Sequence, residues 1–275
     1  MAGHLSKDRY RKWRIQMVKG LYTAYTGMIN EQNRMDIMTN NLANASTVGY
    51  KKEGSTSQSF DDVLTVKIKD QSVGMRNVQR LGVKNPGVKI GENYTDYSQG
   101  SFRITGNTYD LALSGEGFFA IEFTNKAGET DTKYTRAGQF TLNKDGYLVT
   151  EEGDYVLDTQ NRRIRLNTLI DSSITDDGTI YQNGQAVAKI QVTDFEDYDY
   201  LEKYGETYYQ PIQGAKTIAA KAQVKSGYLE MANVQIVSEM VNLISITRAY
   251  ESNQKVVQTI DDTLDVAVNQ IGRVQ

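Results

Sequence analysis

Residues 236–271 read IVSEMVNLISITRAYESNQKVVQTIDDTLDVAVNQI, and this stretch decides how the rest of the chain is organised. Every seventh residue in it is apolar or aromatic: Ile236, Leu243, Tyr250, Val257, Leu264 and Ile271. The stretch holds no proline, and the first glycine after its start is Gly272. A seven-residue apolar repeat is typical of a long helix that supercoils against a partner. We therefore predict a helix about 60 Å long over residues 233–271, which is too long for one small domain to cover.

A second row in the same stretch is mixed in character. Met240 and Val268 are apolar, but Thr247, Gln254 and Asp261 lie between them. One apolar row beside a half-polar row forms only a narrow seam. The expected partner is therefore a narrow stripe as well.

A matching stripe lies near the N-terminus. Its main row has a spacing of seven: Leu21, Met28, Met35 and Leu42. The interleaved row consists of Ala24, Glu31, Met38 and Ala45, of which only Glu31 is charged. We predict that a first helix over residues 18–43 pairs with the last helix in a coiled coil. The alternative, two amphipathic helices packed on one globular core, stays open at this point.

Composition narrows the possible functions. The 275 residues include no cysteine, which excludes disulfides and thiolate chemistry, and the chain has no apolar run long enough to cross a membrane. Residues 1–16 carry a net charge of +4 from five basic residues and one acid, which leaves −7 for the remainder of the total of −3. This basic start lacks the apolar core of a secretory signal peptide, and its role is open. The acidic remainder argues against nucleic acid as a partner.

The central part of the chain has the pattern of short strands. Residues 51–93 are polar and read as a linker with one extended element near residues 60–68. From residue 94 to 227, alternating segments are separated by turn sequences such as those ending at Gly146, Gly153, Gly178 and Gly184. Regular short strands predict an antiparallel sandwich or barrel-like domain. The predicted fold class is α+β, with long N- and C-terminal helices in a coiled coil and a central all-β antiparallel domain.

Enzyme chemistry has little support in the sequence. Gly115-Glu-Gly117-Phe-Phe-Ala120 fits a dinucleotide-binding spacing, but such a motif must open a helix, and residues 118–123 read as a strand. His4 is the only histidine and lies in the extension of residues 1–16, which argues against Ser–His catalysis and histidine-rich zinc sites. We therefore expect no catalytic, cofactor-binding or metal-binding residues.

The end of the first helix resembles a known family. Residues 36–51 read DIMTNNLANASTVGYK, and this segment is similar to the N-terminal signature of bacterial flagellar rod and hook proteins. In that signature a helix ends in Asn-Asn-Leu-Ala-Asn and a short linker leads to Gly-Phe-Lys or Gly-Tyr-Lys. The matching positions are Asn40, Asn41, Leu42, Ala43, Asn44 and Gly49. Residues 1–16 lie outside the pattern.

The resemblance extends over most of the chain. Residues 100–119, 134–140 and 145–149 are similar to the segments that enter the β-domain of that family, and residues 224–233 to its return into the last helix. Within the last helix, Arg248-Ala249-Tyr250-Glu251 resembles the distal-rod members more than the proximal-rod members.

What the resemblance implies is a structural, self-assembling subunit of the flagellar basal-body rod. It implies a helical homopolymer that forms a hollow drive shaft, export by the flagellar export apparatus across the cytoplasmic membrane, and contacts with other rod proteins and the hook protein. No nucleic acid and no membrane insertion are expected. The alternatives are a proximal-rod subunit, or a hook-like or adhesin-like β-rich structural protein. An envelope hydrolase is the weakest class because no nucleophile–base set is visible.

We predict the following division of the chain: an extension at 1–16, a helical coiled-coil domain from 17–50 and 228–275, a linker at 51–93 and an outer β-domain at 94–227. The predicted packing interface between helices and subunits consists of apolar or aromatic residues of the two stripes: Leu21, Met28, Met35, Met38, Leu42, Ile236, Met240, Leu243, Tyr250, Val257, Leu264, Val268 and Ile271. The tyrosine-rich run from Tyr198 to Tyr209 has two open readings, packing on the core or lateral contact between subunits.

Overall fold

The computed structural model describes residues 3–68, 78–125 and 128–269. These residues form two compact units, which are treated separately. The helical unit holds the described residues within 1–40, 53–94 and 237–275. The β-rich unit holds those within 41–52 and 95–236.

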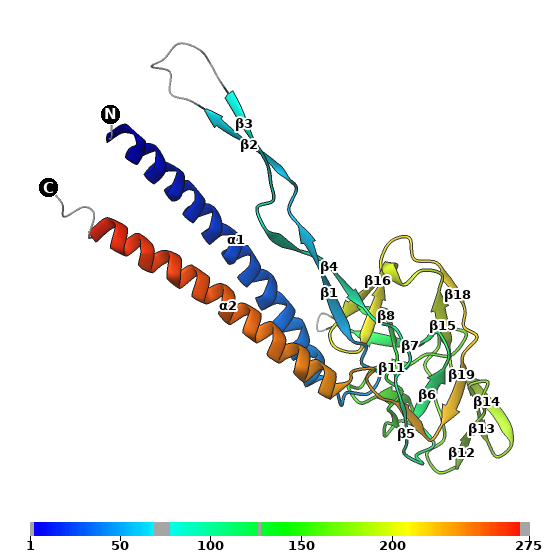
Figure 1. The fold of residues 1–275 in the computed structure, drawn as a ribbon. Coiled ribbons are helices and arrows are strands. Elements are labelled where there is room, and N and C mark those ends of the chain that lie inside the picture. The colour runs from blue at the N-terminus through cyan, green and yellow to red at the C-terminus, as the bar shows by residue number, and fades with distance from the viewer. Residues whose placement is uncertain (1–2, 69–77, 126–127, 270–275) are drawn as a thin grey trace. The chain divides into compact units, whose positions relative to one another are not determined.

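Two long helices dominate the helical unit (Figure 1). Helix α1 spans Gly3–Ala43 and helix α2 spans Ile236–Asn269. Helix α2 contains neither glycine nor proline, and Glu239 places a negative charge in its first turn, which suits the positive end of the helix dipole. The first helix therefore begins well before the predicted residue 18 and ends where the Asn-rich segment predicts.

The predicted coiled coil is contradicted by the structure. Glycines of α1 meet α2 at two positions: a Cβ placed on Gly27 would lie 3.1 Å from Nδ2 of Asn253, and one on Gly20 would lie 3.7 Å from Ile260. A glycine has no side chain to insert between residues of the facing helix, so the interlocking of two apolar rows is not found. Leu21, Met28, Met35, Met38 and Leu42 are all only half-buried. The fold is two long helices and a large β-rich part, without the coiled coil.

The seven-residue row of α2 that faces α1 differs from the predicted pair of rows. Glu239 and Ile246 are buried, and Asn253 and Ile260, seven and fourteen residues after Ile246, are half-buried. The flanking row is half-buried and consists of Leu243, Tyr250, Val257 and Leu264. By contrast, Met240 is 49% exposed and Ile236 is 48% exposed.

Four strands occupy the segment that was expected to be a linker with one extended element. They are β1 (Glu53–Ser59), β2 (Val63–Ile68), β3 (Val78–Lys84) and β4 (Val88–Thr95). Strand β1 pairs with β4, and β2 pairs antiparallel with β3. The segment is tied to α1 by hydrogen bonds from Asn30 Nδ2 to Ser57 Oγ, 3.0 Å, and from Thr23 Oγ1 to the carbonyl of Pro86, 3.2 Å.

The β-rich unit is built from short strands, as the turn spacing predicts. The first half contains β5 (Phe102–Ile104), β6 (Leu111–Ser114), β7 (Phe118–Thr124), β8 (Thr130–Thr135), β9 (Phe140–Leu142), β10 (Leu148–Thr150) and β11 (Tyr155–Val156). The second half contains β12 (Ser172–Ile174), β13 (Thr179–Gln182), β14 (Gln185–Lys189), β15 (Val192–Phe195), η1 (Tyr198–Tyr200), β16 (Leu201–Tyr204), β17 (Tyr208–Pro211), β18 (Thr217–Ala219), β19 (Gln223–Ser226) and β20 (Tyr228–Glu230).

The largest sheet among the described residues has nine strands, and β7, whose first four residues are buried, lies in the middle of it. Seven strands follow the order β16-β17-β8-β7-β11-β10-β9, and β15 pairs with both β7 and β18. Strand β7 pairs antiparallel with β8, β11 and β15. Phe119 on one face of β7 packs into a cluster with Leu111, Phe140 and Leu148, and Phe118 on the other face packs with Tyr209 and Phe195. The alternation along β7 thus gives the unit a core on both faces of the sheet.

The Gly115-Glu-Gly117 pattern leads into strand β7 and not into a helix. Gly115 and Gly117 have φ values of 119° and 136°, so they serve a turn before the strand. Neither α1 nor α2, within the described residues, is long and apolar enough to cross a membrane. The described residues also contain no cluster of His, Cys, Asp and Glu that could hold a metal ion.

Candidate functional site at the junction of the chain ends

The turn after α1 is built from the Asn-rich segment. Asn44 closes it: its carbonyl accepts from the backbone N–H of Thr47 at 3.1 Å, and its Oδ1 accepts from the Thr47 hydroxyl at 3.1 Å. Val48 then pairs in a β-bridge with Met231, which lies just before α2. The segment that leaves α1 therefore lies beside the segment that returns to α2.

Gly49 sits where these segments meet a third. Its φ is 70°, and its N–H donates to the carbonyl of Glu230 at 2.8 Å. A Cβ at this position would lie 2.3 Å from the backbone nitrogen of Ala137, far inside any real contact distance. Both the positive φ and the close approach of the backbone require glycine.

Tyr50 fills the space between the end of α1 and the segment that precedes α2. Its side chain is 1% exposed and packs with Ala232 and Val234. Its hydroxyl donates to Oδ1 of the fully buried Asn41 at 3.0 Å. The tyrosine thus links the last turn of α1 to the segment before α2, and its hydroxyl keeps a partner despite burial.

A buried ion cluster completes the junction. Lys51 Nζ lies 2.6 Å from Oε1 of Glu230, and Arg136 Nη1 lies 3.3 Å from Oε2 of the same carboxylate. The side chains of Lys51, Arg136 and Glu230 are 1%, 3% and 0% exposed. Oε1 also accepts from the N–H of Gly100 at 3.0 Å, and Lys51 Nζ donates to the carbonyl of Ser98 at 2.8 Å. One carboxylate therefore holds two cations away from water. We call Lys51, Arg136 and Glu230 the ion cluster.

Burial lowers the pKa of Lys51, and the nearby charge of Glu230 opposes this effect. At the edge of the junction, a hydrogen bond from the backbone N–H of Ser98 lowers the pKa of Asp96. Asn233 supplies further links: its Oδ1 accepts from the N–H of Lys52 at 2.7 Å, and its Nδ2 donates to the carbonyl of Asp96 at 2.7 Å. Three segments distant in sequence are thus fixed by named polar contacts.

The sequence motifs contained these residues, but their meeting was not predicted. Lys51 ends the family-like segment 36–51, Arg136 lies in segment 134–140 and Glu230 lies in segment 224–233. Charged residues are normally exposed, so nothing in their spacing indicates burial. The sequence did offer one signal for this cluster: each of the three motifs, which are otherwise apolar or rich in turn residues, carries a charged residue. Two of these charges are positive and one is negative.

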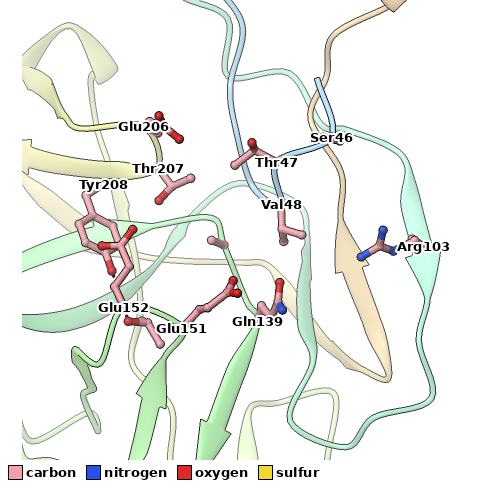
Figure 2. Close-up of a pocket in the computed structure, with 12 residues that line it drawn as sticks. Ser46, Thr47, Val48, Arg103, Gln139, Glu151, Glu152, Glu206, Thr207 and Tyr208 are labelled. Carbon is pink, nitrogen blue, oxygen red and sulfur yellow. Dashed lines mark hydrogen bonds between the residues drawn. The ribbon is translucent and has the colours of Figure 1, made fainter. Parts of the chain in front are cut away.

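A groove of about 460 Å³ lies next to this junction (Figure 2). Glu151, Glu152 and Glu206 lie along one part of it, and Arg103 lies on another side. Tyr208 at its wall donates to Asp154 Oδ2 at 2.9 Å, and burial raises the pKa of that tyrosine. Its lining residues include neither histidine nor cysteine.

The residues of the family motifs lie near the end of α1 and on α2, and they differ in burial. Asn41 and Asn44 are buried, Gly49 is buried, and Leu42 is half-buried, whereas Asn40 and Ala43 are exposed. On α2, Ala249 and Tyr250 are half-buried while Arg248 and Glu251 are exposed. The side chain of Val268 and the position of Ile271 lie outside the described residues. The role of the heptad residues in subunit packing stays a prediction.

The tyrosine-rich run serves partly as core. Tyr208 and Tyr209 are 5% and 0% exposed, and Tyr198 packs against Phe118 with ring centroids 5.8 Å apart. Tyr200 and Tyr204 are 42% and 43% exposed. Tyr198, Tyr208 and Tyr209 therefore pack on the core. Lateral contact between subunits stays a prediction for the two exposed tyrosines.

Family models match three parts of the chain. The C-terminal model of the flagellar basal body rod FlgEFG proteins matches residues 225–271, the flagellar hook protein FlgE/F/G D1 domain matches residues 112–184, and the flagella basal body rod protein model matches residues 21–51. The flagellar basal-body rod protein FlgG of Bacillus subtilis is 34% identical over 272 residues, which cover 92% of this chain and 99% of that protein. The chain belongs to the flagellar basal-body rod protein family.

Other relatives carry related names. The flagellar basal-body rod protein FlgF of Caulobacter vibrioides is 32% identical over 94% of this chain and all of that protein. The flagellar hook-basal body complex protein FlhO of Bacillus subtilis is 30% identical over 94% of this chain. As a member of this family the chain is a structural subunit of the flagellar basal-body rod, and not an enzyme. Within the β-rich unit, the ion cluster joins the segment that follows α1 to the segment that precedes α2.

Proposed function

We propose that this chain is a distal-rod subunit that polymerises with copies of itself into a hollow helical shaft. The shaft carries torque from motor to hook, and its subunits cross the cytoplasmic membrane through the flagellar export apparatus. The observation that carries the proposal is the exposure of apolar side chains on long helices: Val237, Val241 and Ile244 of α2 are 76%, 60% and 54% exposed. Helices gain most of their stability from packing, so such faces favour neighbours.

The distal position is supported by the Arg248-Ala-Tyr-Glu251 segment and by the 34% identity to FlgG of Bacillus subtilis. The 32% identity to FlgF of Caulobacter vibrioides keeps the proximal position, that of the FlgF type, as the alternative. Expression of this chain in Caulobacter vibrioides strains that lack either FlgG or FlgF tests the difference. Restored swimming of the strain without FlgG supports the distal position, and restoration only in the strain without FlgF contradicts it.

Polymerisation can be tested with the purified chain. We expect sedimentable filaments above a critical concentration, visible by electron microscopy. Removal of α1 up to Asn40, or of α2 from Val237 onward, should abolish them, while the β-rich unit keeps its circular dichroism. Filaments that persist without one of the helices would contradict self-assembly through the helices.

Tyr250→Asp is expected to prevent assembly while the β-rich unit still folds. Tyr250 is half-buried in the row of α2 that flanks the row facing α1, so a carboxylate there loses part of its hydration without a designed partner. The expected cost is about 1–3 kcal/mol in every subunit. Tyr250→Phe keeps the ring and should assemble with only mild weakening. The measurement is sedimentation of filaments. Normal filaments from Tyr250→Asp would show that this residue takes no part in assembly.

A further inference from the structure

The outer face of α2 carries a compact apolar patch at its N-terminal end. Val237, Met240, Val241 and Ile244 are 76%, 49%, 60% and 54% exposed. Their spacing of three and four residues places them on one face of the helix. That face is opposite the one that carries Ile246, Asn253 and Ile260, which turns toward α1. We call these four residues the outer α2 patch.

The patch is set apart because the same face becomes polar beyond it. Arg248, Glu251 and Lys255 continue the face beyond Ile244, and all three are exposed. The next exposed apolar residue on this face is Val266, 22 residues beyond Ile244 and 48% exposed. Four apolar residues grouped in the first turns of a long helix, with a long polar stretch after them, indicate a contact concentrated at that height.

Helix α1 carries a second patch. Tyr22, Tyr25 and Ile29 are 49%, 51% and 39% exposed, at a spacing that places them on one face. They lie away from the side of Gly20 and Gly27 that meets α2. Gln32 and Asp36, which continue this face, are polar and exposed. We call the three residues the outer α1 patch.

The contacts between the helices fix the relative heights of the two patches. Gly20 lies against Ile260 and Gly27 lies against Asn253, so the two helices run antiparallel. Residues at the same height on the two helices therefore have numbers that add up to 280. By this rule Tyr25 lies level with Lys255. The outer α2 patch is centred near Val241, fourteen residues from Lys255 (255 − 241 = 14). At the rise of an α-helix this is about 21 Å along the helix axis. The two patches therefore lie on opposite outer sides of one helix pair and at different heights.

We propose that the outer α2 patch of one copy docks on the outer α1 patch of a second copy, which is displaced by about 21 Å along the helices. This inference rests on the proposed self-assembly and names its contact. The aromatic rings of Tyr22 and Tyr25 would cover the branched side chains of Val237, Val241 and Ile244. Because each copy offers one patch of each kind on opposite sides, the contact is heterologous and leaves a free patch at both ends of any array. Such a contact adds copies side by side with a constant stagger.

Cysteine cross-linking tests the stagger directly, since the chain has no cysteine of its own. Full-length chains with Tyr25→Cys are mixed with chains with Val241→Cys and oxidised under assembly conditions. A disulfide requires Cα atoms within about 7 Å, so we expect covalent dimers from this mixture. The matched control mixes Tyr25→Cys with Lys255→Cys, the position at equal height on the same face of α2, and should give little dimer. Neither single-cysteine chain alone should dimerise, because the contact is heterologous.

The outcomes separate this inference from the proposed function. Filaments without the Tyr25→Cys–Val241→Cys disulfide would overturn the staggered contact and leave self-assembly standing. A stronger disulfide with Lys255→Cys would show an unstaggered contact and also overturn it. Disulfides without filaments would support the contact while opposing the shaft. Neither disulfides nor filaments, or a patch covered only by another flagellar protein in isolated basal bodies, would overturn the contact between copies.

A substitution pair gives a second readout. Val241→Asp places a charge in the centre of the outer α2 patch and should raise the critical concentration for filaments at least tenfold. Val256→Asp is the control, because Val256 is 45% exposed on the same helix about four turns beyond the patch. It should change the critical concentration less than twofold. Equal effects of the two variants would contradict a localised patch.

Discussion

Replacing Glu230 by glutamine is expected to lower the free energy of unfolding of the β-rich unit by about 3–5 kcal/mol. The carboxylate is fully buried and is shared by Lys51 at 2.6 Å and Arg136 at 3.3 Å. Without it, two cations remain out of water with no anion between them. Removal of one member of a buried ion group costs far more than the group contributes relative to an apolar core. Urea unfolding followed by the near-ultraviolet circular dichroism of the tyrosines measures the change.

Two further variants test that explanation. Lys51→Met leaves Glu230 paired with Arg136 and with the N–H of Gly100, so its cost should be smaller, about 1–3 kcal/mol. Adding Lys51→Met to Glu230→Gln removes one of the two unpaired cations and should restore part of the loss. If Lys51→Met proved as costly as Glu230→Gln, charge balance would not be the reason for the effect.

An exposed ion pair provides the matched control. Lys216 and Glu196 lie 3.3 Å apart, and their side chains are 77% and 63% exposed. Glu196→Gln makes the same chemical change as Glu230→Gln but leaves a lysine in water. The expected change in unfolding free energy is below about 0.5 kcal/mol. The contrast isolates burial as the cause.

The sequence predicted the long elements better than their contacts. The stop after Ala43 followed from asparagine and glycine, which act through local backbone preferences. The strand after Gly117 followed from the apolar run, although the glycine spacing pointed to a different kind of site. The end of α1 and the start of β7 each depend on about ten residues of sequence, so local backbone and side-chain preferences are sufficient to predict them.

The helix contact was missed because it uses residues that a search for apolar rows passes over. The row of α2 that faces α1 contains Glu239 and Asn253, while the apolar Met240 next to this row is 49% exposed. On α1 the contact positions are Gly20 and Gly27, which have no side chain to count. A seven-residue period alone therefore identified a long helix but not the face that it turns to its neighbour.

The ion cluster lay beyond sequence reasoning for a different reason. Glu230 is separated from Lys51 by 179 residues and from Arg136 by 94. The attraction between them depends on burial, and burial depends on the assembled sheet. Only the fold brings the three motifs together, although each motif was recognisable by itself.

Gly49→Ala is expected to lower the free energy of unfolding by about 2–5 kcal/mol, the sum of backbone strain and overpacking. Gly49 has a φ of 70°, and an added Cβ would lie 2.3 Å from the backbone nitrogen of Ala137. The neighbouring backbone must move, and with it the hydrogen bond from Gly49 to the carbonyl of Glu230. The measurement is urea unfolding, with hydrogen exchange at the Gly49 position as a local readout.

Gly106 allows the two causes of that loss to be separated. Its φ is 72°, almost the same as that of Gly49, but an added Cβ would meet no atom within 4 Å. Gly106→Ala should therefore cost only the strain of the left-handed conformation, about 1–2 kcal/mol. The difference between the two variants measures how tightly the segment after α1 is pressed against the residues that follow Arg136. Equal losses would mean that Gly49 is required only for its conformation, and that the junction is looser than the contact of Gly49 with Ala137 indicates.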